Sequence, residues 1–91
     1  MNRTIILTNP EIFNKIRALS NRYRFKIIEL SLNKEKTITQ LGKELNLSYK
    51  RCSDYCVKLE TNNLIKKRKE GKEVYVKSIL NLYSLAKEFI I

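Results

Sequence analysis

Residues 37–77 read TITQLGKELNLSYKRCSDYCVKLETNNLIKKRKEGKEVYVK, and this stretch decides the fold. Leucines at helical spacing precede and follow a polar break at residues 46–48. Asn46 tolerates the left-handed backbone conformation that ends a helix, and a serine two residues later can cap the next one. The pattern predicts a short helix over residues 40–45, capped by Thr39, and a second helix over residues 49–62, joined by a tight turn.

A basic hairpin is predicted directly after the second helix, over residues 66–77. Asn63 takes the place after a helix that glycine often occupies, and Gly71 supplies the positive φ of a tight turn. A turn centred on Glu70-Gly71 places Ile65 opposite Val76 and Arg68 opposite Glu73. Val74 and Val76 then share one face, which is typical of a half-buried strand.

Helices are also expected on both sides of this stretch. The Thr-Asn-Pro-Glu run at residues 8–11 predicts a start for a helix over residues 9–19, whose apolar stripe is Ile12, Phe13, Ile16 and Leu19. A helix over residues 21–32 is expected to bury Tyr23, Phe25, Ile27, Ile28, Leu30 and Leu32. Residues 78–91 are interpreted as a last helix capped by Ser78, and residues 3–7 as a short strand or an extended arm.

The predicted architecture is mostly α with a small β-hairpin, in the order α-α-(β)-α-α-β-β-α, where the bracketed strand is one extended step at residues 37–38. The 91 residues are expected to form a single domain over residues 1–91. Apolar residues make up 43% of the chain, too many for a disordered protein. A core this small is marginal alone, so dimerisation is a natural remedy.

The chain is strongly basic, with a formal net charge of +10 from 19 Lys and Arg against 9 Asp and Glu. Such an excess favours acidic partners, nucleic acid first and an anionic membrane surface second. The lysine-rich surface of a heat-adapted protein is an alternative, but it does not explain why the positive charge is concentrated in particular places. No apolar run reaches the roughly twenty residues that span a bilayer, and the N-terminus lacks a signal-peptide core, so we expect a cytoplasmic protein without a membrane partner.

Catalysis and metal binding lack their usual residues. The sequence has no His, which removes the commonest general base and the commonest metal ligand. Two cysteines alone cannot complete a four-ligand zinc site within one chain. No glycine-rich phosphate loop or recognisable pair of carboxylates occurs, so we expect no enzyme, no cofactor and no metal, and no small-molecule ligand is evident.

The predicted helix over residues 49–62 has an apolar face with Cys52, Cys56 and Leu59 and a polar face opposite. The polar face suits insertion into a DNA major groove, where the first turns of a helix meet base edges. Its candidate DNA-binding residues are Ser48, Tyr49, Lys50, Arg51, Ser53, Asp54, Tyr55 and Lys58. An ordinary solvated amphipathic helix is the alternative.

Each polar side chain on this helix has a role that its chemistry suggests. Arg51 and Lys50 can donate to guanine or to phosphates, and the tyrosines can reach phosphates, sugars or thymine methyls. Asp54 can accept from cytosine or orient Arg51. The basic hairpin that follows strengthens the prediction of DNA binding, because two basic elements succeed each other. Its candidate residues are Lys66, Lys67, Arg68, Lys69 and Lys72.

The stretch resembles a winged helix–turn–helix of the ArsR/MarR type, a large group of prokaryotic transcription regulators. The resemblance covers residues 18 to 77 and rests on Leu47-Ser48, Leu59 and Leu64-Ile65, and upstream on Leu19-Ser20, Arg24 and Ile27-Ile28 in ALSNRYRFKIIELS. It implies a double-stranded DNA-binding regulator whose helix over residues 49–62 reads bases, while the basic hairpin forms a wing along the minor groove or backbone. Asn63 stands where the family usually has Gly.

Cys52 and Cys56 lie four residues apart on one helix face, a spacing that suits a soft metal or a redox pair. The sensing cysteines of ArsR-type proteins often lie in the preceding helix, which has no cysteine here. The two positions match ones that hold Val or Leu in the family core, and cysteine is often fully buried. We therefore favour core packing over sensing.

The last predicted helix carries apolar residues on more than one face, so one face is left for a partner, and the helix over residues 9–19 has a similar apolar stripe. In the family the terminal helices make the dimer, which implies a homodimer whose two recognition helices lie ~34 Å apart. The candidate dimerisation residues are Ile12, Phe13, Ile16, Leu82, Tyr83, Leu85 and Phe89. The alternative is an intramolecular core with a frayed tail.

The sequence is compatible with two functions. The first is a homodimeric regulator of transcription that binds duplex DNA sequence-specifically. The second is a winged-helix module that binds nucleic acid without sequence preference or mediates protein interaction. Specific binding above a salt-dependent background distinguishes the two.

Overall fold

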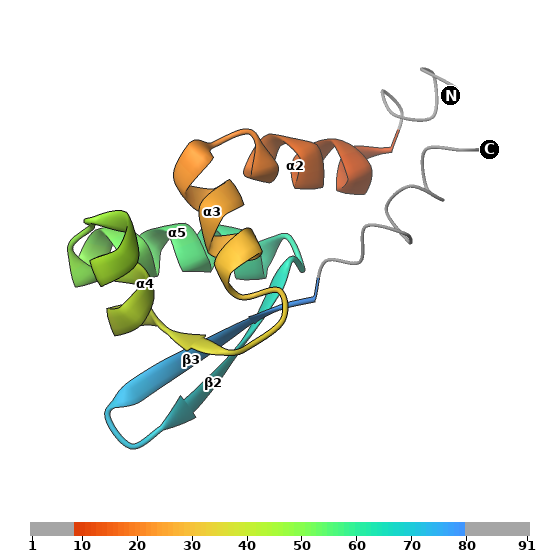
Figure 1. Cartoon of the computed structure of the whole chain (residues 1–91). Helices are drawn as coiled ribbons and strands as arrows, with labels where there is room; N and C mark the ends of the chain where they lie inside the picture. The colour runs from red at the N-terminus through yellow and green to blue at the C-terminus, as the bar shows by residue number, and fades with distance from the viewer. Residues whose placement is uncertain (1–8, 80–91) are drawn as a thin grey trace.

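The structure is a computed structural model and describes residues 9–79. The predicted arm over residues 3–7 and the predicted helix after Ile79 lie outside these residues, and Ser78 is the last residue of a strand rather than a helix cap. The described elements follow the predicted order and form the winged helix–turn–helix arrangement in Figure 1: α2 (Pro10–Leu19), α3 (Arg22–Leu30), β1 (Lys36–Thr37), α4 (Ile38–Leu45), α5 (Tyr49–Thr61), β2 (Ile65–Glu70) and β3 (Glu73–Ser78). No helix within residues 9–79 is long and apolar enough to cross a membrane.

Asparagine side chains start the first two described helices. The Asn9 side chain accepts a hydrogen bond from the backbone N–H of Ile12, and Pro10 occupies the first turn. Asn21 caps α3 by accepting from the N–H groups of Tyr23 and Arg24. These bonds satisfy backbone donors that the first turn of a helix leaves free, which fixes where α2 and α3 begin.

The start of α4 corrects the sequence prediction, because the cap is Thr37 and not Thr39. Thr37 Oγ1 accepts from the Gln40 N–H at 3.0 Å, and Gln40 Oε1 accepts from the Thr37 N–H at 2.8 Å. This reciprocal pair is a capping box and satisfies two backbone donors at once, whereas Thr39 offers no such pairing. The helix therefore begins at Ile38.

The turn between α4 and α5 is built as the sequence predicts. Asn46 adopts the left-handed conformation with φ 56°, and Ser48 caps α5 through the Arg51 N–H. The Leu47 N–H donates to the Gly42 carbonyl at 2.8 Å, and a Cβ on Gly42 would lie 3.0 Å from the Leu47 oxygen. The turn thus packs directly on α4, and this contact sets the angle of α5.

The sheet order is β1-β3-β2, and its register differs from the prediction by two residues. Ile65 pairs with Ser78 and Arg68 with Tyr75, so the two-residue turn is Gly71-Lys72 rather than Glu70-Gly71. Gly71, with φ 61°, takes the first turn position, which suits a hairpin turn with glycine first. A shift of two residues leaves the side-chain faces unchanged, so Val76 is buried as expected.

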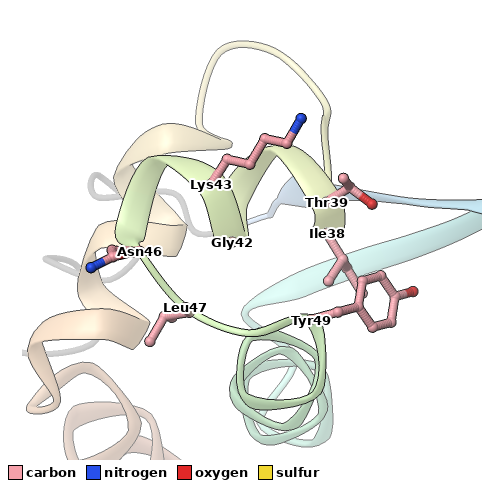
Figure 2. Close-up of a pocket in the computed structure, with 7 residues that line it drawn as sticks. All are labelled: Ile38, Thr39, Gly42, Lys43, Asn46, Leu47 and Tyr49. Atoms are coloured by element: carbon pink, nitrogen blue, oxygen red, sulfur yellow. The ribbon is translucent and has the colours of Figure 1, made fainter.

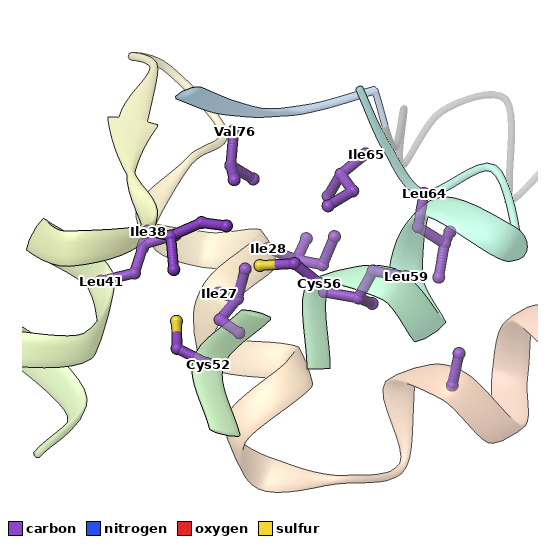
Figure 3. Close-up of a cluster of buried hydrophobic side chains, with 11 residues drawn as sticks. Ile27, Ile28, Ile38, Leu41, Cys52, Cys56, Leu59, Leu64, Ile65 and Val76 are labelled. Carbon is purple, nitrogen blue, oxygen red and sulfur yellow. The ribbon is translucent and has the colours of Figure 1, made fainter. Parts of the chain in front are cut away.

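The core lies between α3, α4, α5 and the base of the hairpin, as Figure 3 shows. Cys52 and Cys56 are each 0% exposed within it, which confirms the prediction of core packing. Ile27 and Ile28 are buried beside them. Phe25, predicted to be buried, is 47% exposed, because it precedes Ile27 by two positions and so projects from another side of the helix.

Candidate nucleic-acid interface

The first turn of α5 stands exposed beside α4. Tyr49 is 50% exposed, and Lys50 and Arg51 are also exposed. Figure 2 shows the Tyr49 ring beside Ile38, at a shallow pocket that α4 and the turn line together. The predicted reading residues at the start of α5 are therefore accessible to a large partner.

Two residues of α4 that the sequence reasoning missed belong to this surface. Thr39 and Lys43 line the same pocket as Tyr49, and Figure 2 shows both projecting from α4. They lie four residues apart, hence on one face of the helix, away from the buried Leu41. Examination of the outward face of the helix before the turn would have found them.

Lys50 and Asp54 pair across one helical turn. Their Nζ and Oδ2 atoms lie 3.3 Å apart, and the two side chains are 85% and 65% exposed. Asp54 therefore pairs with Lys50 and not with Arg51, the partner that the sequence suggested. An exposed pair of this kind contributes on the order of 0.3–0.5 kcal/mol, so either side chain can exchange it for a contact with DNA.

The Tyr23 and Tyr55 rings stack at a centroid distance of 5.5 Å and join α3 to α5. The Arg51 guanidinium lies over both rings, 5.7 Å and 6.0 Å from their centroids, and donates to the Tyr55 hydroxyl at 3.3 Å. Tyr55 is half-buried and packs within the protein. Arg51 gives up cation–π contacts of about 0.5–1 kcal/mol each if it reaches a guanine, where a bidentate contact discriminates by about 1–3 kcal/mol. The stack therefore positions Arg51 through contacts that are weak enough to exchange for others.

The remaining predicted residues of α5 occupy different settings. Ser48 is exposed but its hydroxyl caps the helix. Ser53 is half-buried, whereas Lys58 is exposed near the end of the helix. Of these three residues, only Ser48 lies at the start of the helix, next to Tyr49.

The hairpin, called the wing below, comprises residues 65–78 and has two faces. Lys67 and Lys69 pair with Val76 and Val74, on the face toward α5, while Arg68 pairs with Tyr75 on the other. Lys67 Nζ lies 3.2 Å from a Glu60 carboxylate oxygen of α5. Lys67 therefore ties the wing to α5.

Arg68 lies in the middle of β2 and is held there by several neighbours. It donates to both carboxylate oxygens of Glu35, at 3.2 Å and 2.9 Å, and to Glu70 at 3.1 Å, while its guanidinium lies 4.4 Å from the Tyr75 ring centroid. The hydrogen bond from Arg68 lowers the pKa of Glu35 below its usual value, and the two carboxylates raise the pKa of Arg68. The sequence presented Arg68 as part of the DNA surface, but the structure places it in an ion-pair network that joins the wing to the loop before β1.

Lys66, Lys69 and Lys72 are the exposed lysines of the wing. None of them makes an ion pair with any residue between 9 and 79. In Figure 1 the tip of the wing and the junction of α4 with α5 lie toward the same side of the molecule. Lys72 belongs to the turn at this tip and so lies toward the same side as the start of α5, whereas Lys66 and Lys69 project from opposite faces of β2.

The predicted dimerisation residues fall into two groups. On α2, Phe13 is 43% exposed and Ile16 37% exposed, while Ile12 is buried within the chain. Leu82, Tyr83, Leu85 and Phe89 lie outside the described residues.

Comparison with solved structures gives the same fold throughout. The transcriptional regulator HlyU from Vibrio vulnificus is 23% identical, with a TM-score of 0.73 over 100% of both chains. A homodimeric winged helix–turn–helix DNA-binding domain from Mycobacterium bovis, a possible ArsR-family transcriptional regulator, is 20% identical, with a TM-score of 0.75 over 98% of this chain and 80% of that one. An ArsR-like transcriptional regulator from Rhodococcus is 20% identical, with a TM-score of 0.70 over 87% and 73%.

These structures share the winged helix–turn–helix fold that the resemblance implied. No curated protein sequence matches the chain. A family model described as winged helix–turn–helix matches residues 22–87, which contain α3, the helix–turn–helix pair and the wing. The chain therefore belongs to the winged helix–turn–helix family.

Proposed function

We propose that the chain is a single domain that binds double-stranded DNA sequence-specifically, as a homodimer, and regulates transcription in the cytoplasm. The observation that carries this proposal is the exposed first turn of α5 together with three exposed lysines of the wing that make no ion pair within residues 9–79. The first turn enters the major groove, where Tyr49, Lys50 and Arg51 meet base edges. Lys66, Lys69 and Lys72 follow the backbone or minor groove.

Homodimerisation is supported by the Mycobacterium bovis domain, whose structure is homodimeric. Phe13 and Ile16 offer an apolar strip on α2 for such a contact. A two-fold axis would present two α5 helices to half-sites one turn of duplex apart, ~34 Å.

Selection of bound sites from a random duplex pool tests the proposal. A specific regulator enriches a two-half-site sequence that survives random competitor as salt rises, because base contacts add to the salt-dependent phosphate term. If binding to the enriched and to the random duplexes falls equally as salt rises, the result would instead favour a winged-helix module that binds nucleic acid without sequence preference.

Two variants separate the roles of α5 and the wing. We expect Arg51→Ala to relax the preference at one base pair and to cost about 1–3 kcal/mol on the selected site. Lys69→Ala should weaken all duplexes alike and lower the salt slope by about 0.9. Lys26→Gln, on the exposed side of α3, is the matched control and should bind as the unmodified protein does. Unchanged binding by both test variants would reject this face.

A further inference from the structure

A polar groove runs between α2 and α5, apart from the first turn of α5 and the wing. It has a volume of about 530 Å³, and its charged lining consists of Arg17, Arg24, Asp54 and Lys58. This volume falls within the range of small-ligand sites. In Figure 1, α2 lies above α5, and α3 connects the two layers. The proposed DNA contacts leave Arg17 and Arg24 without a role.

Arg24 is anchored at one edge of the groove. Its Nε donates to the Ala18 carbonyl at 2.7 Å, and its guanidinium lies 5.9 Å from the centroid of the Tyr55 ring. Its side chain is half-buried, and its terminal amino groups make no hydrogen bond with any residue between 9 and 79. A guanidinium fixed in this way keeps a planar pair of donors for an oxyanion and loses little entropy on binding one.

Helix electrostatics accounts for two of the three cations but not for Arg24. Arg17 and Lys58 lie in the last turns of α2 and α5, where positive charge is favourable. Arg24 lies in the first turn of α3, which holds no acidic residue and where positive charge is unfavourable. An anion in the groove would offset this unfavourable placement.

The other groups around the groove leave its charge positive. Asp54 is the one carboxylate in the lining against the three cations, and Lys50, outside the groove, also pairs with it at 3.3 Å. The Thr61 hydroxyl and the Asn62 amide already donate to carbonyls of α5. The Ser20 hydroxyl likewise donates to the Arg17 carbonyl, so the cations and side-chain amide groups remain as donors for a ligand, a set that selects for negative charge.

We propose that this groove binds a phosphate group, with the Arg24 guanidinium as its bidentate donor and with Arg17 and Lys58 as flanking charges. The phosphate belongs either to the backbone of the bound duplex beyond the base-reading turn or to a free phosphate ester. The duplex source rests on the proposed function, and the free source does not.

Titration of the full chain with inorganic phosphate, followed by two-dimensional amide NMR, tests the groove without DNA. Chloride at matched ionic strength is the reference. We expect saturable shifts at amides around Ala18, Arg24 and Lys58 with phosphate only. Arg17→Gln, an exposed change, should weaken this binding about tenfold, since a charge-assisted contact is lost. Arg24→Lys keeps the charge but loses the planar pair of donors, so it should also weaken phosphate binding. Lys26→Gln should leave phosphate binding unchanged.

Duplex binding then identifies the source of the phosphate. If the groove holds a backbone phosphate, Arg17→Gln lowers the salt slope on the selected duplex by about 0.9. Replacement of the contacted phosphate by one neutral methylphosphonate should then give the unmodified protein and Arg17→Gln the same affinity for the duplex. If the slope stays unchanged while phosphate shifts are saturable, the ligand is a free phosphate ester.

The proposal is overturned if phosphate and chloride give the same shifts and Arg17→Gln also keeps the salt slope of Lys26→Gln. If the unmodified protein binds no duplex, the proposed function fails, and the phosphate titration still decides the groove by itself.

Discussion

The sequence makes Arg51 and Arg68 equal candidates for DNA contact, and both are exposed in the structure. Their environments nevertheless differ. Arg51 rests on two aromatic rings and can leave them at little cost. Arg68 is held by Glu35, Glu70 and Tyr75, so a contact with DNA would break a network that supports the wing. At the scale of the residue, exposure alone does not identify a DNA contact.

The Glu35–Arg68 pair predicts a pH dependence of stability. Because the hydrogen bond from Arg68 holds the pKa of Glu35 below its usual value, the pair stabilises the fold at pH above that usual value, and its contribution disappears as pH falls through the folded pKa. We expect Arg68→Gln to move the Glu35 titration upward and to flatten the fall in the thermal midpoint between about pH 5 and pH 3. Carbon NMR of the Glu35 carboxyl and thermal melts measure both effects. An unshifted Glu35 titration in the unmodified protein would contradict the pairing.

The core cysteines should be inert while the protein is folded. Both thiols are 0% exposed, so a reagent reaches neither in the folded protein, and the neighbouring Cys52 thiol and burial also raise the pKa of Cys56, which disfavours its reactive thiolate. We expect iodoacetamide at about pH 8 to label folded protein far more slowly than urea-unfolded protein, as mass spectrometry would show. The single variants Cys52→Ala and Cys56→Ala assign any label to one site. Labelling of the folded chain at the unfolded rate would show that this core opens readily.

At the scale of the element, the start of α4 gives a matched pair of threonines. Thr37 caps the helix, whereas Thr39 makes one exposed bond to Glu73. We expect Thr37→Ala to lower the free energy of unfolding by about 1 kcal/mol and Thr39→Ala by less than about 0.5 kcal/mol. Urea denaturation followed by circular dichroism measures both. A larger loss at Thr39 than at Thr37 would reject the observed cap.

The sequence predicted every described element in its order, because the signals concerned were local. Asn46 and Asn63 have positive φ as expected, at 56° and 57°, because asparagine tolerates this conformation better than most residues. The cap of α4 was wrong because β-branched Ile38 suggested an extended step, while the capping box at Thr37 outweighed that preference.

The sequence pattern did not predict contacts between residues far apart in the chain. The hairpin register was wrong by two residues, because glycine occupies either place in a two-residue turn and both choices bury Val76. The contacts of Arg68 with Glu35 and of Tyr23 with Tyr55 join residues 33 and 32 positions apart. No spacing rule predicts them, so the division of the basic residues into free and paired required the structure.

At the scale of the whole molecule, the proposed dimer depends on α2. Replacement of both Phe13 and Ile16 by Ser removes apolar area from each of two copies, and each side chain contributes about 1.5–3 kcal/mol when fully buried. We therefore expect the dimer dissociation constant to rise on the order of 100-fold or more. Size-exclusion chromatography with light scattering over a concentration series measures it.

Phe25→Ser is the matched control, because Phe25 is 47% exposed on α3 and should leave the dimer intact. If the double α2 variant still has the mass of a dimer, the dimer interface does not depend on α2. An unmodified protein that remains monomeric at high concentration would remove the two-half-site arrangement.

The position of β2 at the edge of the sheet has a consequence for solubility. Within residues 9–79, β2 pairs only with β3, so its other edge offers free backbone groups to a strand of another molecule. Lysines along such an edge discourage this pairing by charge repulsion and hydration. Lys66 and Lys69 therefore discourage aggregation through this edge, and a wing without its lysines would expose the strand to cross-β assembly.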